Sequence, residues 1–554
     1  MAKYTSVDLP PRTRILTNKN NQKYVYFSIS SEYQKGKKYS LDKRVLIGKL
    51  DPKDPKKLIP NDRYFEIFPN KEKIDECENQ QFNFSQNFGH YALFEKIIED
   101  LGLDKIFEEV FGDRAEIIKA LAYYFLENKN SKIQHFEKWA FNNYCGLNKV
   151  PSQGTISNIL NKEIDDKTIA EFNTKWAKHA QSLLHNIKKV FVNLDGTNFN
   201  FSSPNIDIAE YGYAKDQENN PIINVVYLND QHYGLPLFHD VYPGSITDQT
   251  QCSMVVEKAN NLGFKDLCFV ADRGYYSAEN LSFIDKKGYK FVCMAKTYIK
   301  TIKELINKFK KDVYLNTANY IEDFDVYGIK SKEFVYKAIN KKYNTFIFYS
   351  AAKSEREINY FKNVAKVLKK QFSNVKKVNE QMLLETKNYL TIEFDETTKR
   401  ITNIGINKEK LQEVIDQSGY FVIVSNENLT PEEVLKIYKR RDNIEKTFKV
   451  LKSQCDLYKT YSTNSSIFSS KMLIGFISTI ISSSIYHKTE ELRSMDSNVT
   501  LPTILGELIK YIVVNEDGKI KRKYRLTSKQ KRIYECFDID ENYVLKLIKK
   551  LNDQ

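Results

Sequence analysis

Five short apolar runs between Lys188 and Ala295 place the strongest limit on how this chain can fold. Three of them, VFVNL, IINVVYLN and LPLFHDVY, follow one another directly and have the composition of β-strands. A helical stretch, DQTQCSMVVEKANNLG, leads to a fourth run, LCFVA, and a helix from about Ser277 leads to a fifth, YKFVCMA. Three successive strands followed by alternating helices and strands predict an α/β sheet with functional residues at the ends of its strands.

This order of elements matches the ribonuclease H-like fold. The chain does not complete that fold directly after Lys300, because mixed strands and Lys-rich helices intervene before the next core-like run, GYFVIVSN. We therefore expect a mixed α/β insertion domain that interrupts the core. Its aromatic residues favour core packing over stacking on a nucleic-acid base; they are Tyr314, Tyr320, Tyr327, Phe346 and Phe348.

The charge balance favours a polyanionic partner. The chain has 85 Lys and Arg residues against 71 Asp and Glu residues, a net charge of +14. Each phosphate that a basic residue neutralises releases a counterion, which makes nucleic acid the natural candidate. AT-rich coding alone would enrich Lys, so the charge carries limited weight. The segment Lys519–Arg532, which has eight basic residues and no acidic residue, fits either phosphate contact or a solvated tail.

Cysteine use and hydropathy indicate a reducing, cytoplasmic compartment. The seven cysteines are scattered without a CxxC pair, so neither a disulfide framework nor a zinc site is expected. The N-terminus lacks the apolar stretch of a secretory signal. The run Met472–Tyr486 is shorter than the ~20 residues that span a bilayer, so we expect a buried core helix and no membrane partner. The cysteines are Cys77, Cys145, Cys252, Cys268, Cys293, Cys455 and Cys536.

The patterns outside the sheet complete the expected organisation. Residues 20–70 alternate as a small antiparallel β unit, and the period becomes helical from Phe88 to about His185. A short helix after Ser152 fits either a recognition helix or, more commonly, a bundle helix. We expect an N-terminal β-rich unit (1–87), a helical DNA-binding domain (88–187), the core in two parts (188–299 and 427–490), the insertion domain (300–426) and a C-terminal basic region (491–554).

Two aspartates follow buried strand-like runs. Asp195 comes directly after VFVNL, and Asp272 comes directly after LCFVA. Taken singly, each is more typical of a turn residue. At equivalent ends of adjacent parallel strands they would lie together, and paired carboxylates suit Mg²⁺, which prefers a few hard oxygen ligands.

A strongly marked helix carries a third carboxylate. Thr430, Pro431 and Glu433 form a capping box at its start, and the pattern predicts a helix that runs to about Ser453. At ~100° per residue one polar stripe falls within an arc of roughly 60°. This spacing fits a functional face and a solvated charged face equally well. The polar stripe is Tyr438, Arg441, Glu445 and Lys452, and the apolar stripe beside it is Ile437, Ile444, Phe448 and Leu451.

The spacing Tyr438-x2-Arg441-x3-Glu445-x6-Lys452 resembles the YREK signature of bacterial insertion-sequence DDE transposases, the insertion-sequence-four superfamily. The segments YGYAKDQENNPIINVVYLNDQHYGLPLFHDVYPGSITDQ and VADRGYYSAENLSFIDKKGYKFV are similar to that family's blocks. One departure is Ser245, where Asn is expected. Asp248 in the same block fits either a helix cap, which is favoured, or a supporting carboxylate.

The resemblance implies a metal-dependent enzyme that cuts and rejoins DNA. Asp195, Asp272 and Glu445 become the catalytic, metal-binding triad for two Mg²⁺ ions, with Mn²⁺ able to substitute, in an in-line phosphoryl transfer. Tyr438 and Arg441, together with Lys452, become contacts to element-end DNA. The implied partners are double-stranded DNA, both terminal repeats and target, and a second copy in a synaptic homodimer at the bacterial nucleoid. The competing hypotheses are a non-catalytic DNA-binding protein derived from a transposase and a cellular nuclease of ribonuclease H-like fold.

Overall fold

The computed structural model describes the chain in two compact units, each considered by itself. Cys77 and the stretch AKDQEN (214–219) of the segment YGYAKDQENNPIINVVYLNDQHYGLPLFHDVYPGSITDQ lie outside the described residues. The structure describes all residues except 1–3, 5, 19–20, 34–39, 70, 72–83, 129–131, 202–204, 214–219, 458–461, 517 and 554. One unit comprises Met1–Ser85, Ile512–Tyr524 and Lys546–Gln554, and the other Gln86–Tyr511 and Arg525–Leu545.

The first unit contains the predicted antiparallel β unit. Its sheet has the order β1-β5-β4-β3-β2 and buries Val25, Ile47 and Leu58. The predicted basic C-terminal segment begins as a strand, since β18 and β19 form a hairpin in this unit. The elements are β1 (Val7–Asp8), β2 (Thr13–Thr17), β3 (Lys23–Tyr33), β4 (Ser40–Leu50), β5 (Lys57–Pro60), α1 (Asp62–Ile67), β18 (Ile512–Glu516) and β19 (Lys519–Arg522).

The second unit opens with the predicted helical segment. The short helix after Ser152 is α6, and Ile156 on it is buried. The next turn packs on a long helix, α16 (Ser465–Lys488), where the Ser470 hydroxyl donates to the Leu160 carbonyl at 2.7 Å. The segment is therefore part of a helical bundle. The other helices of this unit are α2 (Gly89–Asp100), α3 (Leu103–Phe111), α4 (Ala115–Asn128), α5 (Phe136–Asn142), α6 (Gln153–Asn158), α7 (Asp166–Leu183), α17 (Glu490–Met495), α18 (Leu501–Leu508) and α19 (Ser528–Glu535). Two elements, β6 (Phe84–Asn87) and α20 (Glu541–Asp553), have residues in both units.

Helix α16 is the centre of this bundle. By length and composition it would be able to cross a membrane, but 78% of its most apolar stretch is buried within the protein. Its hydroxyls are satisfied inside the bundle: that of Ser478, for example, donates to the Ala122 carbonyl on α4 at 3.0 Å. The prediction of a buried core helix is confirmed.

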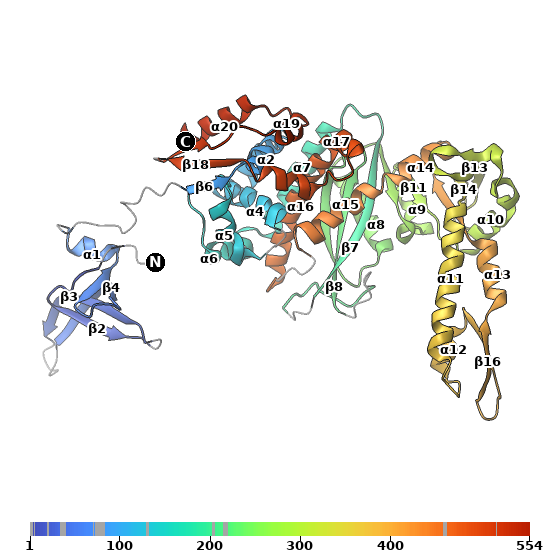
Figure 1. Ribbon diagram of the computed structural model, residues 1–554, viewed down its shortest axis with the longest axis horizontal. Helices are drawn as coiled ribbons and strands as arrows, with labels where there is room; N and C mark the ends of the chain where they lie inside the picture. Colours follow the sequence, from blue (N-terminus) through green and yellow to red (C-terminus); the bar gives the residue numbers. More distant parts are fainter. Residues whose placement is uncertain are drawn as a thin grey trace. The chain divides into compact units, whose positions relative to one another are not determined.

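Nine strands of the described residues form one mixed sheet in the order β12-β13-β14-β17-β11-β10-β7-β8-β9. The five predicted runs are its β9-β8-β7-β10-β11 portion, with β10 parallel to both β7 and β11. Figure 1 shows these strands between the helical bundle and the yellow-green region of the chain. The elements are β7 (Val190–Asn200), β8 (Ile222–Asp230), β9 (Pro236–Pro243), α8 (Asp248–Asn261), β10 (Leu267–Ala271), α9 (Ala278–Lys286) and β11 (Lys290–Met294).

The register of β7 and β10 brings the two predicted aspartates side by side. Leu194 pairs with Ala271, so Asp195 and Asp272 are the next residues on adjacent parallel strands. The prediction that Asp195 ends its strand is wrong. Strand β7 continues to Asn200, because its far half remains paired with β8 after β10 has ended.

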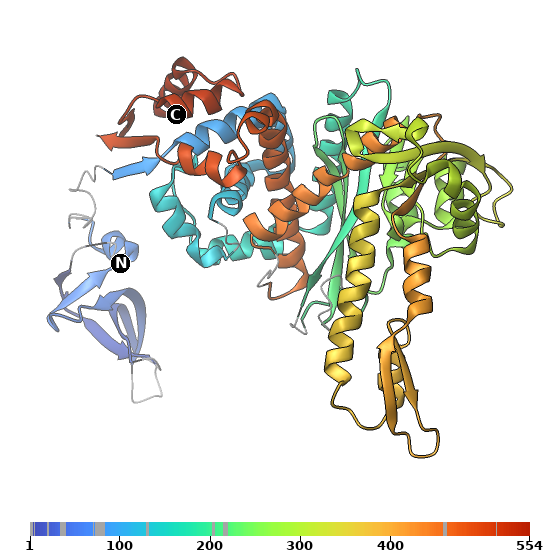
Figure 2. The ribbon, with the colours of Figure 1, turned by 45° about the vertical axis from the view of Figure 1, so that its right-hand side comes forward.

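The residues expected as a separate insertion extend this same sheet. Strands β12, β13 and β14 join it through β17, and Phe346 and Phe348 on β14 are buried in one cluster with Val270 of β10 and Val292 of β11. Core packing of these two aromatics is confirmed. Figures 1 and 2 show the remainder as an arm built from α11, α12, the β15–β16 hairpin and α13. The elements are α10 (Lys300–Val313), β12 (Tyr320–Ile321), β13 (Val326–Glu333), β14 (Tyr343–Tyr349), α11 (Ala351–Phe372), α12 (Glu380–Thr386), β15 (Leu390–Phe394), β16 (Ile401–Ile406), α13 (Lys408–Gln417) and β17 (Tyr420–Ser425).

The helix predicted over 430–453 is divided into three segments. The capping box of Thr430 and Glu433 opens α14 (Pro431–Lys439) as predicted. At Arg440 and Arg441 the winding tightens, and α15 (Asp442–Lys449) follows; a wide turn, η7 (Val450–Gln454), then closes with a bond from the Cys455 amide to the Val450 carbonyl. Both irregular turns change the phase of the helix, so one uninterrupted polar stripe is not retained.

Replacing Phe346 by Ala tests whether β14 shares the core of the sheet. Phe346 is fully buried, so we expect Phe346→Ala to lower the free energy of unfolding by about 3 to 5 kcal/mol, measured by urea denaturation. Tyr320→Ala is the matched control, because Tyr320 is 44% exposed. Equal effects of the two substitutions would contradict a shared core.

Candidate active site

A single arginine connects the three predicted carboxylates. The Arg441 Nη1 lies 2.8 Å from Asp195 Oδ2, and its Nη2 lies 2.8 Å from Glu445 Oε1. The same Nη2 lies 3.9 Å from Asp272 Oδ2. The structure therefore brings Asp195, Asp272, Glu445 and Arg441 together from β7, the end of β10 and the start of α15.

Each aspartate uses its other oxygen to accept a backbone amide one or two residues farther along the chain. Asp195 Oδ1 accepts the Gly196 amide at 2.8 Å, and Asp272 Oδ1 accepts the Gly274 amide at 2.5 Å. For Asp272 the turn role and the site role, posed as alternatives by the sequence, are filled by different oxygens of one side chain, whereas Asp195 lies within β7. These backbone bonds fix the orientation in which the second oxygen faces Arg441.

The charged side chains of the site differ in how deeply they are buried. The side chains of Arg441 and Asp195 are each 14% exposed, whereas that of Glu445 is 56% exposed. Burial alone would lower the pKa of Arg441, but the nearby charge of Asp195, with smaller contributions from Tyr438, Asp272 and Glu445, raises that pKa above its ordinary value. The Arg441–Asp195 pair is the stronger contact, because solvent screens the exposed pair with Glu445.

Buried amides hold the helix junction that carries Arg441. Asn193, two residues before Asp195 and on the same face of β7, donates to the Arg440 carbonyl at 3.1 Å. The Gln231 amide donates to Asn193 Oδ1 at 2.6 Å and to the Ile437 carbonyl at 2.9 Å. The sequence analysis did not predict these positioning residues. The polar residue Asn193 inside the apolar run VFVNL would have indicated the first of them.

Of the other two predicted site residues, Tyr438 lies beside Arg441, whereas Lys452 lies farther along β7. Tyr438 packs against the core cluster, and burial raises the pKa of its hydroxyl. Its ring lies 5.8 Å from the Arg441 guanidinium. Lys452 belongs to the wide turn η7, and its ammonium lies over the Phe199 ring at 5.3 Å. Phe199 is four residues beyond Asp195, roughly 13 Å along β7.

The opposite face of β7 has its own polar groups behind the carboxylates. A Cβ atom on Gly196 would lie 3.2 Å from the Tyr275 hydroxyl and 3.3 Å from Gln251 Oε1. Burial, and then the charges of Asp195, Asp248 and Asp272, raise the pKa of Tyr275. The predicted cap role of Asp248 is wrong, because Thr247 caps α8 and Asp248 is the first helical residue. Asp248 lies beside Gly274, and the Ser245 hydroxyl donates to Glu210.

The donor set suits a hard divalent cation. Three carboxylates supply oxygen ligands of the kind that Mg²⁺ and Mn²⁺ prefer, and all three already contact one positive group. With Arg441 between them, no three carboxylate, His or Cys groups in the described part of the chain converge as a metal site. The oxygen donors are of the type that suits a hard divalent cation. In this structure the positive charge among them is the Arg441 guanidinium.

Removing Arg441 tests its role as the internal counter-charge. Arg441→Met leaves Asp195 buried without its partner, so we expect a loss of about 3 kcal/mol in the free energy of unfolding without divalent metal. Urea denaturation in a chelating buffer measures this loss. Lys449→Met, on the exposed end of α15, should cost little; an equal loss in both variants would contradict the role.

Comparison with known proteins is consistent with this geometry. The family model described as "Transposase DDE domain" matches residues 187–481, a segment that contains all three carboxylates. A solved structure of the piggyBac transposase synaptic complex with hairpin DNA is similar at a TM-score of 0.36 and 9% identity, over 83% of this chain and 82% of that one. No curated protein sequence matches the chain. The match to more than half of the chain shows that it belongs to the family of transposases with a DDE domain.

Proposed function

We propose that this chain is the transposase of an insertion sequence of the insertion-sequence-four superfamily, which cuts DNA at the element ends and joins them to target DNA. The observation that carries the proposal is that Asp195, Asp272 and Glu445 all lie around the Arg441 guanidinium. The strand order β9-β8-β7-β10-β11 supports a ribonuclease H-like core, since the adjacent central strands β7 and β10 bring the two aspartates side by side.

Asp195, Asp272 and Glu445 are the residues that would hold divalent metal. Bound Mg²⁺ or Mn²⁺ would activate the attacking oxygen and neutralise charge on the scissile phosphate. Asp195 and Asp272 are held in place by bonds from the Gly196 and Gly274 amides. Glu445 is exposed on α15, so its position relative to the aspartates depends on the amides that fix the helix junction.

Arg441 has two roles in this proposal. Without metal it neutralises the carboxylates, and its planar fork also suits the oxygens of a DNA phosphate. Tyr438 would support it by lying beside the guanidinium, and Lys452 would contact DNA farther along β7. The proposed DNA contacts therefore lie in two places, one at the metal site and one farther along β7, because Lys452 is seven residues beyond Glu445 on the helix.

The partners in this proposal are double-stranded DNA and a second copy of the chain in a synaptic complex. The net charge of +14 favours association with DNA. The site of action would be the bacterial nucleoid in the cytoplasm.

Isosteric substitutions of the carboxylates test the proposal. A labelled duplex from the DNA flanking the reading frame would be incubated with wild type, Asp195→Asn, Asp272→Asn and Glu445→Gln in Mg²⁺ or Mn²⁺. We expect wild type to cleave and join the duplex. Each variant should still bind it, but its reaction rate should fall by roughly 10³-fold or more.

Product analysis separates the other activities. Asp416→Asn is a matched control, because Asp416 lies on α13 of the arm, and it should leave the rate unchanged. Cleavage without joined products would indicate a nuclease. Wild type that binds yet never cuts in either metal would support a DNA-binding protein, and carboxylate variants that still cut would disprove the proposed site.

A further inference from the structure

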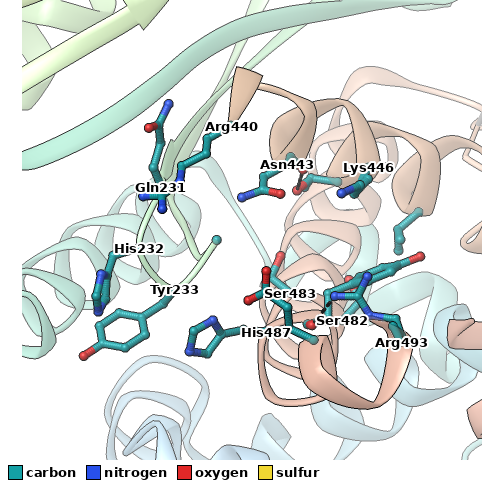
Figure 3. A pocket seen from close by; sticks show the side chains of 15 residues that line it. Gln231, His232, Tyr233, Arg440, Asn443, Lys446, Ser482, Ser483, His487 and Arg493 are labelled. Carbon is teal, nitrogen blue, oxygen red and sulfur yellow. Dashed lines mark hydrogen bonds between the residues drawn. The ribbon is translucent and has the colours of Figure 1, made fainter. Parts of the chain in front are cut away.

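A basic cavity lies on the side of α15 away from the carboxylates. Its volume is about 340 Å³, within the range of small-ligand sites. One wall is formed by α15 and the β8–β9 turn, and the other by the end of α16 and the start of α17. Figure 3 shows Arg440, Asn443 and Lys446 on the first wall, with Ser482, Ser483, His487 and Arg493 opposite.

Positive charge dominates this lining. Arg440, Lys446 and Arg493 are permanent cations, and Glu490 is the only carboxylate among the residues that line the described cavity. Neither Arg440 nor Lys446 forms an ion pair with a described residue. These three cations line one small cavity, and an anion bound in it would be attracted to each of them.

The guanidinium of Arg493 is fixed in place but retains capacity to donate. Its Nη2 donates to the Tyr486 carbonyl at 2.6 Å, and the group lies 5.0 Å from the Tyr486 ring. Its Nε has no acceptor among the described residues. An arginine held in this way loses little side-chain entropy when it binds a ligand.

Neutral donors accompany the cations. The side chains of Asn443 and Ser483 line the cavity as neutral donors. Ser482 also lines it, but its hydroxyl already donates to the Thr479 carbonyl at 3.1 Å. A carboxylate ligand would neutralise one charge, whereas a phosphoryl group carries up to two and has oxygens for several donors. The chemistry of the lining therefore favours a phosphoryl anion.

We propose that this cavity, formed by Arg440, Lys446 and Arg493 behind α15, is a binding site for a phosphoryl anion distinct from the carboxylate site. The source is either a free phosphate compound or a phosphodiester of a DNA backbone. The proposal does not depend on DNA cleavage by the chain. Because Arg440 ends α14 and its carbonyl accepts from Asn193, a bound anion would also stabilise the helix junction next to Arg441.

Calorimetry with inorganic pyrophosphate on the full chain tests the site. We expect wild type to bind, and Lys446→Gln to weaken binding roughly tenfold, since it removes one charged hydrogen bond. Lys449→Gln, one turn away and outside the cavity, should leave affinity unchanged. Asn443→Asp, which adds a carboxylate to the wall, should abolish binding while circular dichroism shows a folded protein.

Two results would overturn the proposal. One is wild-type protein that is folded but does not bind pyrophosphate at millimolar concentration. The other is equal weakening by Lys446→Gln and Lys449→Gln, which would show non-specific attraction.

The salt dependence of binding to a short duplex identifies the source. If Lys446→Gln lowers the slope of log affinity against log salt by about 1, a backbone phosphate occupies the cavity. If the slope is unchanged while pyrophosphate binding falls, the ligand is a free phosphate compound.

Discussion

The contact between Arg441 and Asp195 is the interaction on which the site depends. It joins two segments that are 246 residues apart in the chain, one at the centre of the sheet and one at a helix junction. Both side chains are largely buried, so each requires the other's charge. Glu445 and Asp272 are more exposed and contact the same guanidinium, so the whole carboxylate group is organised around this one pair.

The helix that carries Arg441 and Glu445 is irregular next to these two residues. The carbonyls at its tight turn accept hydrogen bonds from Asn193 and Gln231, and Asn229 donates to Thr447 about two turns later. These amides are buried in the sheet and would be costly without partners. With the helix held in this way, one face of α15 lies toward the carboxylates and the other lines the basic cavity.

The sequence predicted the parts of the fold that local pattern determines. Strand composition and order located β7 to β11, and the capping box located α14. The ends of strand-like runs located Asp195 and Asp272, and the polar helix stripe located Glu445; the structure brings these three carboxylates together. Tyr438 and Lys452 are 14 residues apart, so even a regular helix would separate them by roughly 20 Å along its axis. The tight and wide turns, which the sequence did not predict, change the phase of the stripe. Nor did the sequence show that β12 to β14 extend the main sheet, since edge pairing depends on β17, which returns some 70 residues later. The predicted domain boundaries and the roles of the six site residues stay predictions.

The most direct measurement of the account is the location of Mn²⁺ by anomalous scattering in crystals of the chain. The account predicts an ion bound by oxygens of Asp195 and Asp272, with the Arg441 guanidinium withdrawn from Asp195. An Arg441 that still bridges Asp195 and Glu445 in saturating Mn²⁺, with no ion between the aspartates, would contradict it.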